Sequence, residues 1–116
     1  MTCTDLTKFA RILMLSLAAI VLLAQPSFAQ LIVSTFVDSS IQRFNETTGA
    51  PLPPLVPPGG SGLMQPAGMT IGPDNNLYVS SQSTNSVLRF NSTTGAFLGT
   101  FATMSANYSP AGLRFG

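Results

Sequence analysis

Residues 31–116 consist of short apolar or alternating runs separated by clusters of Gly, Pro, Asn, Asp and Ser. Such clusters bound β-strands and form tight turns, and no stretch of this part has helical periodicity flanked by caps. The pattern therefore predicts an all-β fold of antiparallel strands. The expected strands are residues 31–34, 40–44, 52–56, 67–71, 77–81, 86–90, 96–101 and 111–115.

Two segments of this pattern carry turn or edge signals. Five prolines lie in or beside residues 52–56, and proline has no N–H to donate to a ladder, so we expect this strand at an outer edge. Residues 72–76, Gly-Pro-Asp-Asn-Asn, are typical of a turn, because Pro presets φ and Asn tolerates the left-handed region. A calcium loop is the alternative, but Ca²⁺ takes about six to eight oxygen ligands and this loop has one carboxylate.

The sequence contains an internal repeat. Residues 31–50 and 77–96 are identical at eleven of twenty positions at an offset of 46, and residues 66–72 recur as residues 110–116 at an offset of 44. Both offsets fall in the range of β-propeller blades, about 40 to 50 residues. The repeat predicts antiparallel four-stranded β-propeller blades, about two of them, whereas a closed propeller has roughly four to eight.

The strand order within the repeat divides the chain into parts. We expect residues 30–58 to supply the second to fourth strands of one blade, residues 66–101 a complete blade, and residues 110–116 the first strand of the next. Repeat units cannot bury their apolar faces alone, and about three or more in a row are usually needed. Two interpretations follow: the chain is a fragment of a longer propeller, or several chains assemble into one.

Three strings carry a family resemblance: residues 66–69 (PAGM), 72–80 (GPDNNLYVS) and 87–90 (VLRF). They resemble the NHL-type propeller repeat and the related repeats of the gluconolactonase-like and streptogramin-lyase-like six-bladed propellers. The resemblance implies an incomplete propeller and covers nearly all of residues 30–116. Two positions depart from the family pattern, since Asn75 stands where glycine is usual and residues 81–82 (Ser-Gln) stand where aspartate is usual.

The resemblance assigns no catalytic residue to this chain. The lactonase-like members use acidic and Asn metal ligands gathered from several blades, and the lyase-like members depend on a histidine, of which this sequence has none. We therefore assign no catalytic, cofactor-binding or metal-binding residue. Thr70 and Arg114 share one repeat position on the strands predicted to be innermost, and they are candidate channel-lining residues. We expect six aromatic residues in the core between blades: Phe44, Tyr78, Phe90, Phe97, Phe101 and Phe115.

The first 29 residues are typical of a signal peptide. Lys8 and Arg11 precede residues 12–24, an apolar run with a single serine, and small residues at 27 and 29 place the cleavage after Ala29. Thirteen residues fall short of the roughly 20 that a spanning helix needs. We expect a signal helix within residues 1–29 and a secreted or periplasmic product without a stable membrane span; an uncleaved anchor is the alternative.

The composition of residues 30–116 excludes several classes. They contain three arginines against three acidic residues, with no lysine, histidine or cysteine, because Cys3 lies in the signal. This balance lacks the basic footprint of a nucleic-acid-binding protein, and the lack of cysteine excludes a disulfide scaffold.

Repeats without a catalytic set favour an exported propeller scaffold, a truncated part of a longer propeller, that binds a protein or a glycan without catalysis and without a cofactor. One alternative is a fragment of a lactonase- or lyase-like six-bladed enzyme. A second is a two-blade, lectin-like chain that trimerises into a six-bladed ring. If the chain is not a fragment, we expect a homo-oligomer.

Overall fold

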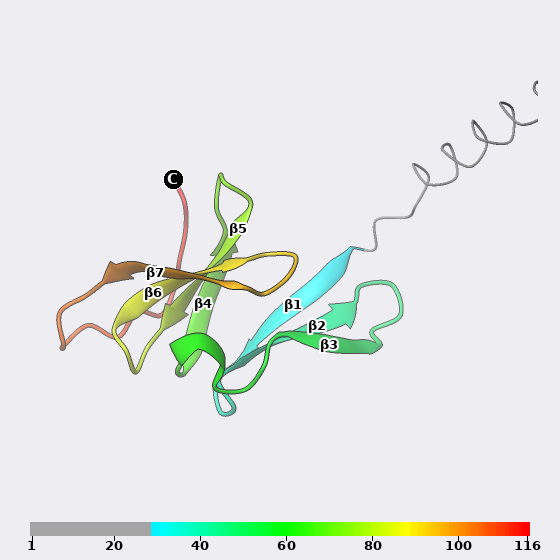
Figure 1. The fold of residues 1–116 in the computed structure, drawn as a ribbon, viewed down its shortest axis with the longest axis horizontal. Coiled ribbons are helices and arrows are strands. Elements are labelled where there is room, and N and C mark those ends of the chain that lie inside the picture. Colours follow the sequence, from blue (N-terminus) through cyan, green and yellow to red (C-terminus); the bar gives the residue numbers. More distant parts are fainter. Residues whose placement is uncertain (1–28) are drawn as a thin grey trace, which may run out of the picture.

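The computed structural model describes residues 29–116, which form two antiparallel sheets (Figure 1). Sheet 1 has three strands in the order β1 (Gln30–Thr35), β2 (Ser40–Asn45) and β3 (Pro51–Val56). A short 3₁₀-helix, η1 (Gly60–Gly62), leads into sheet 2. Sheet 2 has four strands in the order β4 (Pro66–Ile71), β5 (Asn76–Ser81), β6 (Ser86–Asn91) and β7 (Phe97–Thr103). The predicted all-β, antiparallel fold is confirmed for this part of the chain.

The expected signal peptide lies outside the described residues, except for Ala29 at its end. Within residues 29–116, no helix has the length and the apolar character needed to cross a membrane.

The repeated sequence forms the same turn in both sheets. The side-chain oxygens of Asn45 and Asn91 each accept hydrogen bonds from the backbone N–H groups two and three positions later, all at 2.9 Å. The turns then pass through Gly49 and Gly95, with φ of 71° and 74°. Only glycine enters this region without a steric cost, so the repeated Asn and Gly both have a local structural reason.

The proline-rich strand β3 is an edge strand, as predicted. It pairs with β2 alone, and the register shifts between Ile41 and Arg43. The carbonyl of Pro53 accepts a hydrogen bond from the Arg43 guanidinium at 2.8 Å. The edge position therefore tolerates the missing proline N–H groups.

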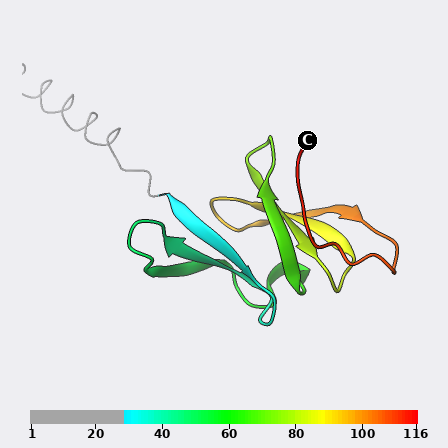
Figure 2. The same ribbon diagram turned by 180° about the vertical axis from the view of Figure 1, so that it is seen from behind.

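The expected eighth strand, at residues 111–115, is not a strand in the structure. No strand of the described chain pairs with residues 110–116, which we call the C-terminal segment, and a strand without a ladder partner leaves its backbone unpaired. The segment runs beside β4 in the same direction, because Gly68 approaches Ala111 and Gly72 approaches Phe115. The prediction of a regular strand here is wrong for lack of a neighbour, although the segment lies next to the sheet (Figure 2).

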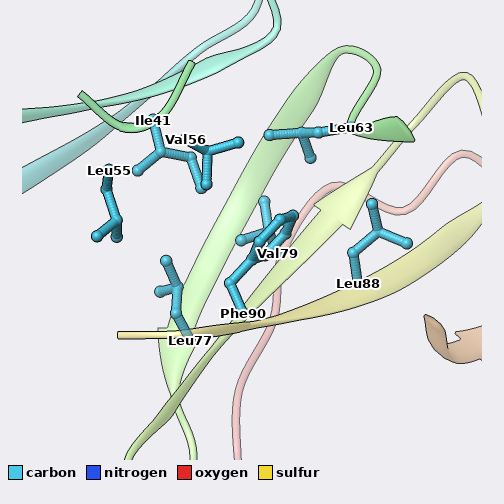
Figure 3. Packing of buried hydrophobic residues seen from close by; sticks show 8 residues of the cluster. All are labelled: Ile41, Leu55, Val56, Leu63, Leu77, Val79, Leu88 and Phe90. Carbon is cyan, nitrogen blue, oxygen red and sulfur yellow. The ribbon is translucent and has the colours of Figure 1, made fainter. Parts of the chain in front are cut away.

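The core lies between the two sheets. Side chains alternate between the faces of a strand, so the register of β5 and β6 gives sheet 2 a front face that includes Leu77, Val79, Leu88 and Phe90. This front face packs on Ile41 and its neighbours from sheet 1. The buried cluster, shown in Figure 3, contains Ile41, Leu55, Val56, Leu63, Leu77, Val79, Leu88 and Phe90.

The other face of sheet 2, its back face, carries Tyr78, Ser80, Val87 and Arg89 and lies under the C-terminal segment. Sheet 1 has corresponding faces by the repeat. Its back face includes Ile32, Ser34, Ile41 and Arg43 and faces sheet 2, whereas its front face includes Leu31, Val33, Gln42 and Phe44 and faces away from it.

Candidate functional site

The candidate site is a pocket between the back face of sheet 2 and the C-terminal segment. Its volume is about 150 Å³. The lining combines one charged side chain and two hydroxyl-bearing side chains with apolar ones: Thr70, Tyr78, Val87, Phe101, Ala102, Leu113, Arg114 and Phe115.

Tyr78 is the centre of the pocket wall. Its ring meets the rings of Phe101 and Phe115 edge to face, each with a centroid distance of 4.9 Å. Edge-to-face packing is a favourable arrangement for aromatic rings. A Cβ atom on Gly72 would lie 2.5 Å from the tyrosine ring, so the turn approaches this wall only because residue 72 is glycine.

The predicted turn at residues 72–76 positions one carboxylate beside Tyr78. The Asp74 carboxylate accepts hydrogen bonds from the Asn76 side-chain amide at 2.8 Å and from the Tyr78 hydroxyl at 2.9 Å. Arg89 forms an exposed ion pair with it at 3.7 Å. The hydrogen bond from the Asn76 side chain lowers the pKa of Asp74, and those from the Asn76 backbone and Tyr78 act in the same direction against partial desolvation.

The Asp74 carboxylate is therefore held by hydrogen bonds from its own turn. Asn75 takes the left-handed conformation with φ of 60°, and the Gly72 N–H donates to the Asn76 carbonyl at 2.9 Å. This geometry confirms the turn that was predicted. Among residues 29–116, no three His, Cys, Asp or Glu side chains form a group that could hold a metal ion.

Ser80 connects sheet 2 to the C-terminal segment. Its hydroxyl accepts a hydrogen bond from the Gly68 N–H at 2.7 Å. Its single O–H is shared between two carbonyl acceptors, that of Gly68 at 3.1 Å and that of Ala111 at 3.3 Å. The serine thus holds β4 and the C-terminal segment in one register.

The contact made by Ser80 repeats one between the sheets. Ser34, its repeat equivalent, donates to the Ala67 carbonyl at 3.1 Å. Ala67 and Ala111 are also repeat equivalents. Sheet 1 therefore contacts β4 through the same atoms that sheet 2 uses to contact the C-terminal segment. Sequence reasoning missed this pair of contacts, although the identity of Ser34 and Ser80 at the repeat offset was a usable signal.

The pocket offers recognition groups rather than a catalytic set. Arg114 is exposed, and a guanidinium donates well to carboxylates and to other oxygen acceptors. Ligand pockets for drug-sized molecules are usually about 300–1,000 Å³, so this pocket accepts a side chain or a small polar group at most.

The structure brings the two candidate channel residues together, because Thr70 and Arg114 line the same pocket. Whether they face a channel stays a prediction. Tyr78 is 5% exposed but lies on the back face of sheet 2, away from sheet 1, and Phe44 is half-buried. The aromatic prediction is confirmed for Phe90, which is 0% exposed and lies in the core between the sheets. It is wrong for three others, since Phe97, Phe101 and Phe115 are 43%, 59% and 40% exposed. The pocket-side rings Phe101 and Phe115 lack a further sheet to cover them.

Comparison with known proteins gave no match: no family model, no curated protein and no solved structure is significantly similar to this chain. The grounds for a functional assignment are therefore the internal repeat and the contacts of residues 29–116.

Proposed function

We propose that the chain is an exported β-propeller repeat scaffold of the NHL type that binds a protein or a glycan without catalysing a reaction. Sheet 2 is a complete four-stranded blade in this proposal, and sheet 1 supplies the second to fourth strands of the blade before it. The ligand is recognised where the innermost strands meet, at Thr70 and Arg114.

The observation that carries the proposal is the repeated hydrogen bond from Ser34 to Ala67 and from Ser80 to Ala111. Blades of a propeller stack by one repeated operation, so equivalent residues make equivalent contacts at each step. Two successive steps with the same donor and the same acceptor are what such stacking requires. An unrelated pair of packed sheets has no reason to repeat them.

The residue types favour binding over catalysis. The sequence has no histidine, and the one carboxylate near the pocket, Asp74, is held by its own turn and by Arg89. Arg114 and Thr70 instead supply hydrogen-bond donors beside aromatic side chains. This combination suits a small polar group of a sugar or a peptide side chain.

A glycan array probed with the fluorescently labelled chain tests the proposal. We expect saturable binding to a limited set of sugars, reduced about tenfold by Arg114→Ala, which corresponds to the loss of one charge-assisted hydrogen bond of ~1.4 kcal/mol. Arg43→Ala is the matched control, because Arg43 lies on sheet 1 and bonds its own edge strand. Lactone hydrolysis or lyase activity that chelation abolishes would instead favour the enzyme alternative.

Export has a separate test. Expression of the complete reading frame followed by cell fractionation and N-terminal sequencing should give a product beginning at Gln30, outside the cytoplasm. A product that retains residues 1–29 in the membrane fraction would support an uncleaved anchor.

A further inference from the structure

The first strand of sheet 1 has an open edge. In sheet 2, β5 lies between β4 and β6, whereas β1, the repeat equivalent of β5, pairs with β2 alone among residues 29–116. Native edge strands are usually protected by charges, prolines or bulges, and β1 (QLIVST) contains none of them. The edge of β1 is therefore suited to pair with another strand.

The C-terminal segment is the repeat equivalent of β4, and it has no ladder partner within residues 29–116. It already occupies the position of a first strand. Pro110 is buried like Pro66, and Ala111 accepts the hydrogen bond from Ser80. A Cβ on Gly68 would lie 2.3 Å from the Ala111 carbonyl, whereas a Cβ on Gly112 would meet nothing within 4 Å. The segment is packed on one side and open on the other.

The open surfaces on the two sides of the molecule are complementary. The back face of sheet 1 covers the front face of sheet 2, and there Leu77 and Val79 are 0% exposed. Their equivalents on the front face of sheet 1, Leu31 and Val33, are 54% and 38% exposed. The back face of sheet 2 is the repeat equivalent of the back face of sheet 1, which covers Leu77 and Val79. Repeating the contact between sheets 1 and 2 once more therefore brings the front face of one sheet 1 onto the back face of another sheet 2.

We propose that the C-terminal segment of one copy of this chain pairs with β1 of a second copy and completes its sheet 1 as a four-stranded sheet. The pairing is antiparallel, and its register follows from that of β4 with β5. Thr70 and Ile71 oppose Tyr78 and Leu77, so Arg114 opposes Ile32 and Phe115 opposes Leu31. In the same register, Leu113 opposes Val33.

The proposal rests on the proposed scaffold function and names a partner for it. The contact is head to tail, because different surfaces of the two copies meet, and such contacts close into rings when the rotation allows it. A ring built from copies that each supply two blades would contain about two to four copies, because a propeller has roughly four to eight blades. In this register Arg114 shares the back face of the completed sheet with Ile32, whereas Leu113 and Phe115 share its front face with Val33 and Leu31 and lie against the back face of sheet 2 in the first copy.

Disulfide trapping tests the register. In a Cys3→Ser background, Val33→Cys with Leu113→Cys places two cysteines directly opposite each other across the new ladder. Opposed residues in antiparallel strands have Cα atoms about 4.5–5.5 Å apart, within the range of a disulfide. One copy cannot link to itself, because sheet 2 lies between its β1 and its C-terminal segment. We expect covalent multimers of the full exported chain on a non-reducing gel after mild oxidation.

Ile32→Cys with Leu113→Cys is the matched control, because a slip of one residue turns the side chain to the other face of the strand. We expect at least about tenfold less cross-linked product from this pair, since its Cβ vectors point apart. A second variant does not depend on cysteine: Leu113→Pro removes an N–H from the pairing segment. Light scattering after gel filtration should change from a mass of about two to four chains to that of one.

Equal cross-linking of both cysteine pairs, or a monomeric mass for the unmodified chain, would overturn the proposal. A monomer that still binds glycans with the Arg114 dependence would refute the pairing alone and leave the scaffold function standing. If the copies assembled with the predicted register but bound nothing on the glycan array, the binding function would be refuted and the pairing would stand.

Discussion

The two sheets share eleven of twenty residues at equivalent positions of the repeat and bury some of the shared residues to very different extents. Leu77 is 0% exposed in sheet 2, and Leu31 is 54% exposed in sheet 1. Glycine shows the same contrast, because a Cβ on Gly95 would lie 1.8 Å from the Leu55 carbonyl, whereas a Cβ on Gly49 would have open space. The difference comes from the neighbour, since sheet 2 packs on sheet 1 while the front face of sheet 1 packs on nothing within residues 29–116. The position of a residue in the repeat determines which strand it lies in. The layer that packs against that strand determines how far the residue is buried.

The largest expected difference in stability between the two sheets is that between alanine variants of Leu77 and Leu31. Leu77→Ala leaves a cavity in a packed interface and should lower the free energy of unfolding by about 2–5 kcal/mol. Leu31→Ala, the same change at the equivalent position, should lower it by no more than about 0.5 kcal/mol when measured at concentrations low enough to separate any paired copies. Urea unfolding followed by circular dichroism measures both values.

The leucine pair also tests the proposed assembly. At concentrations where copies interlock, Leu31 becomes buried and its replacement should cost nearly as much as that of Leu77. If both variants lowered stability equally at every dilution, the front face of sheet 1 would have to be buried without the help of a second copy.

Gly49 and Gly95 give the next largest difference. Both have positive φ, so alanine at either position costs about 1–2 kcal/mol from backbone strain alone. Gly95→Ala also forces a methyl group against the Leu55 carbonyl, which should add about 1–3 kcal/mol. The excess of the Gly95 variant over the Gly49 variant in thermal or urea unfolding therefore measures the contact between the sheets. No excess would mean that the sheets do not pack as described.

Much of this fold could be predicted from the sequence because it depends on local signals. Alternation located the strands, Asn and Gly located the turns, and proline located the edge strand β3. These features are settled by neighbouring residues, so a pattern of a few positions is enough. The eighth strand was predicted by the same signals and is absent, because a strand also needs a partner that the local sequence does not encode.

The candidate site was less predictable for the same reason. The repeat offset paired Thr70 with Arg114, and the structure places both on one pocket. The exposure of Phe101 could not be read from the sequence, since an aromatic residue in a strand suits a covered surface equally well. The contact between Arg89 and Asp74 joins a strand to a turn fifteen positions earlier in the chain, and no motif predicts it.

The serine pair gives a smaller expected difference. Ser80→Ala removes the acceptor of the Gly68 N–H together with two donor contacts, at a residue that is 0% exposed. Leaving a buried N–H without a partner costs about 1–3 kcal/mol. Ser34→Ala removes one half-buried hydrogen bond to Ala67 and should cost about 1 kcal/mol or less. Ser80→Ala should also increase proteolysis after Arg114, whereas Ser34→Ala should not, because of these two serines only Ser80 contacts the C-terminal segment.

The smallest expected effect is the pH dependence, which compares one aspartate from each sheet. The hydrogen bond from Thr35 lowers the pKa of Asp38 in sheet 1, and the hydrogen bond from Asn76 lowers the pKa of Asp74 in sheet 2, both from an ordinary value of 3.8. A carboxyl group whose pKa is lower in the folded state stabilises the fold above its ordinary pKa. That contribution is lost as the pH falls through the folded pKa. Stability should therefore decline on acidification below about pH 5.

Asp74→Asn and Asp38→Asn should each flatten that decline by a small amount, because both carboxylates are exposed and solvent screens them. The Asp74 variant should flatten it more, since its carboxylate also accepts from Tyr78 and pairs with Arg89. Urea midpoints measured between pH 3 and pH 7 test this order. A larger effect of Asp38→Asn would mean that most of the stability lost on acidification comes from sheet 1. The hydrogen bonds of Asp74 beside the pocket would then contribute less to stability than those of Asp38.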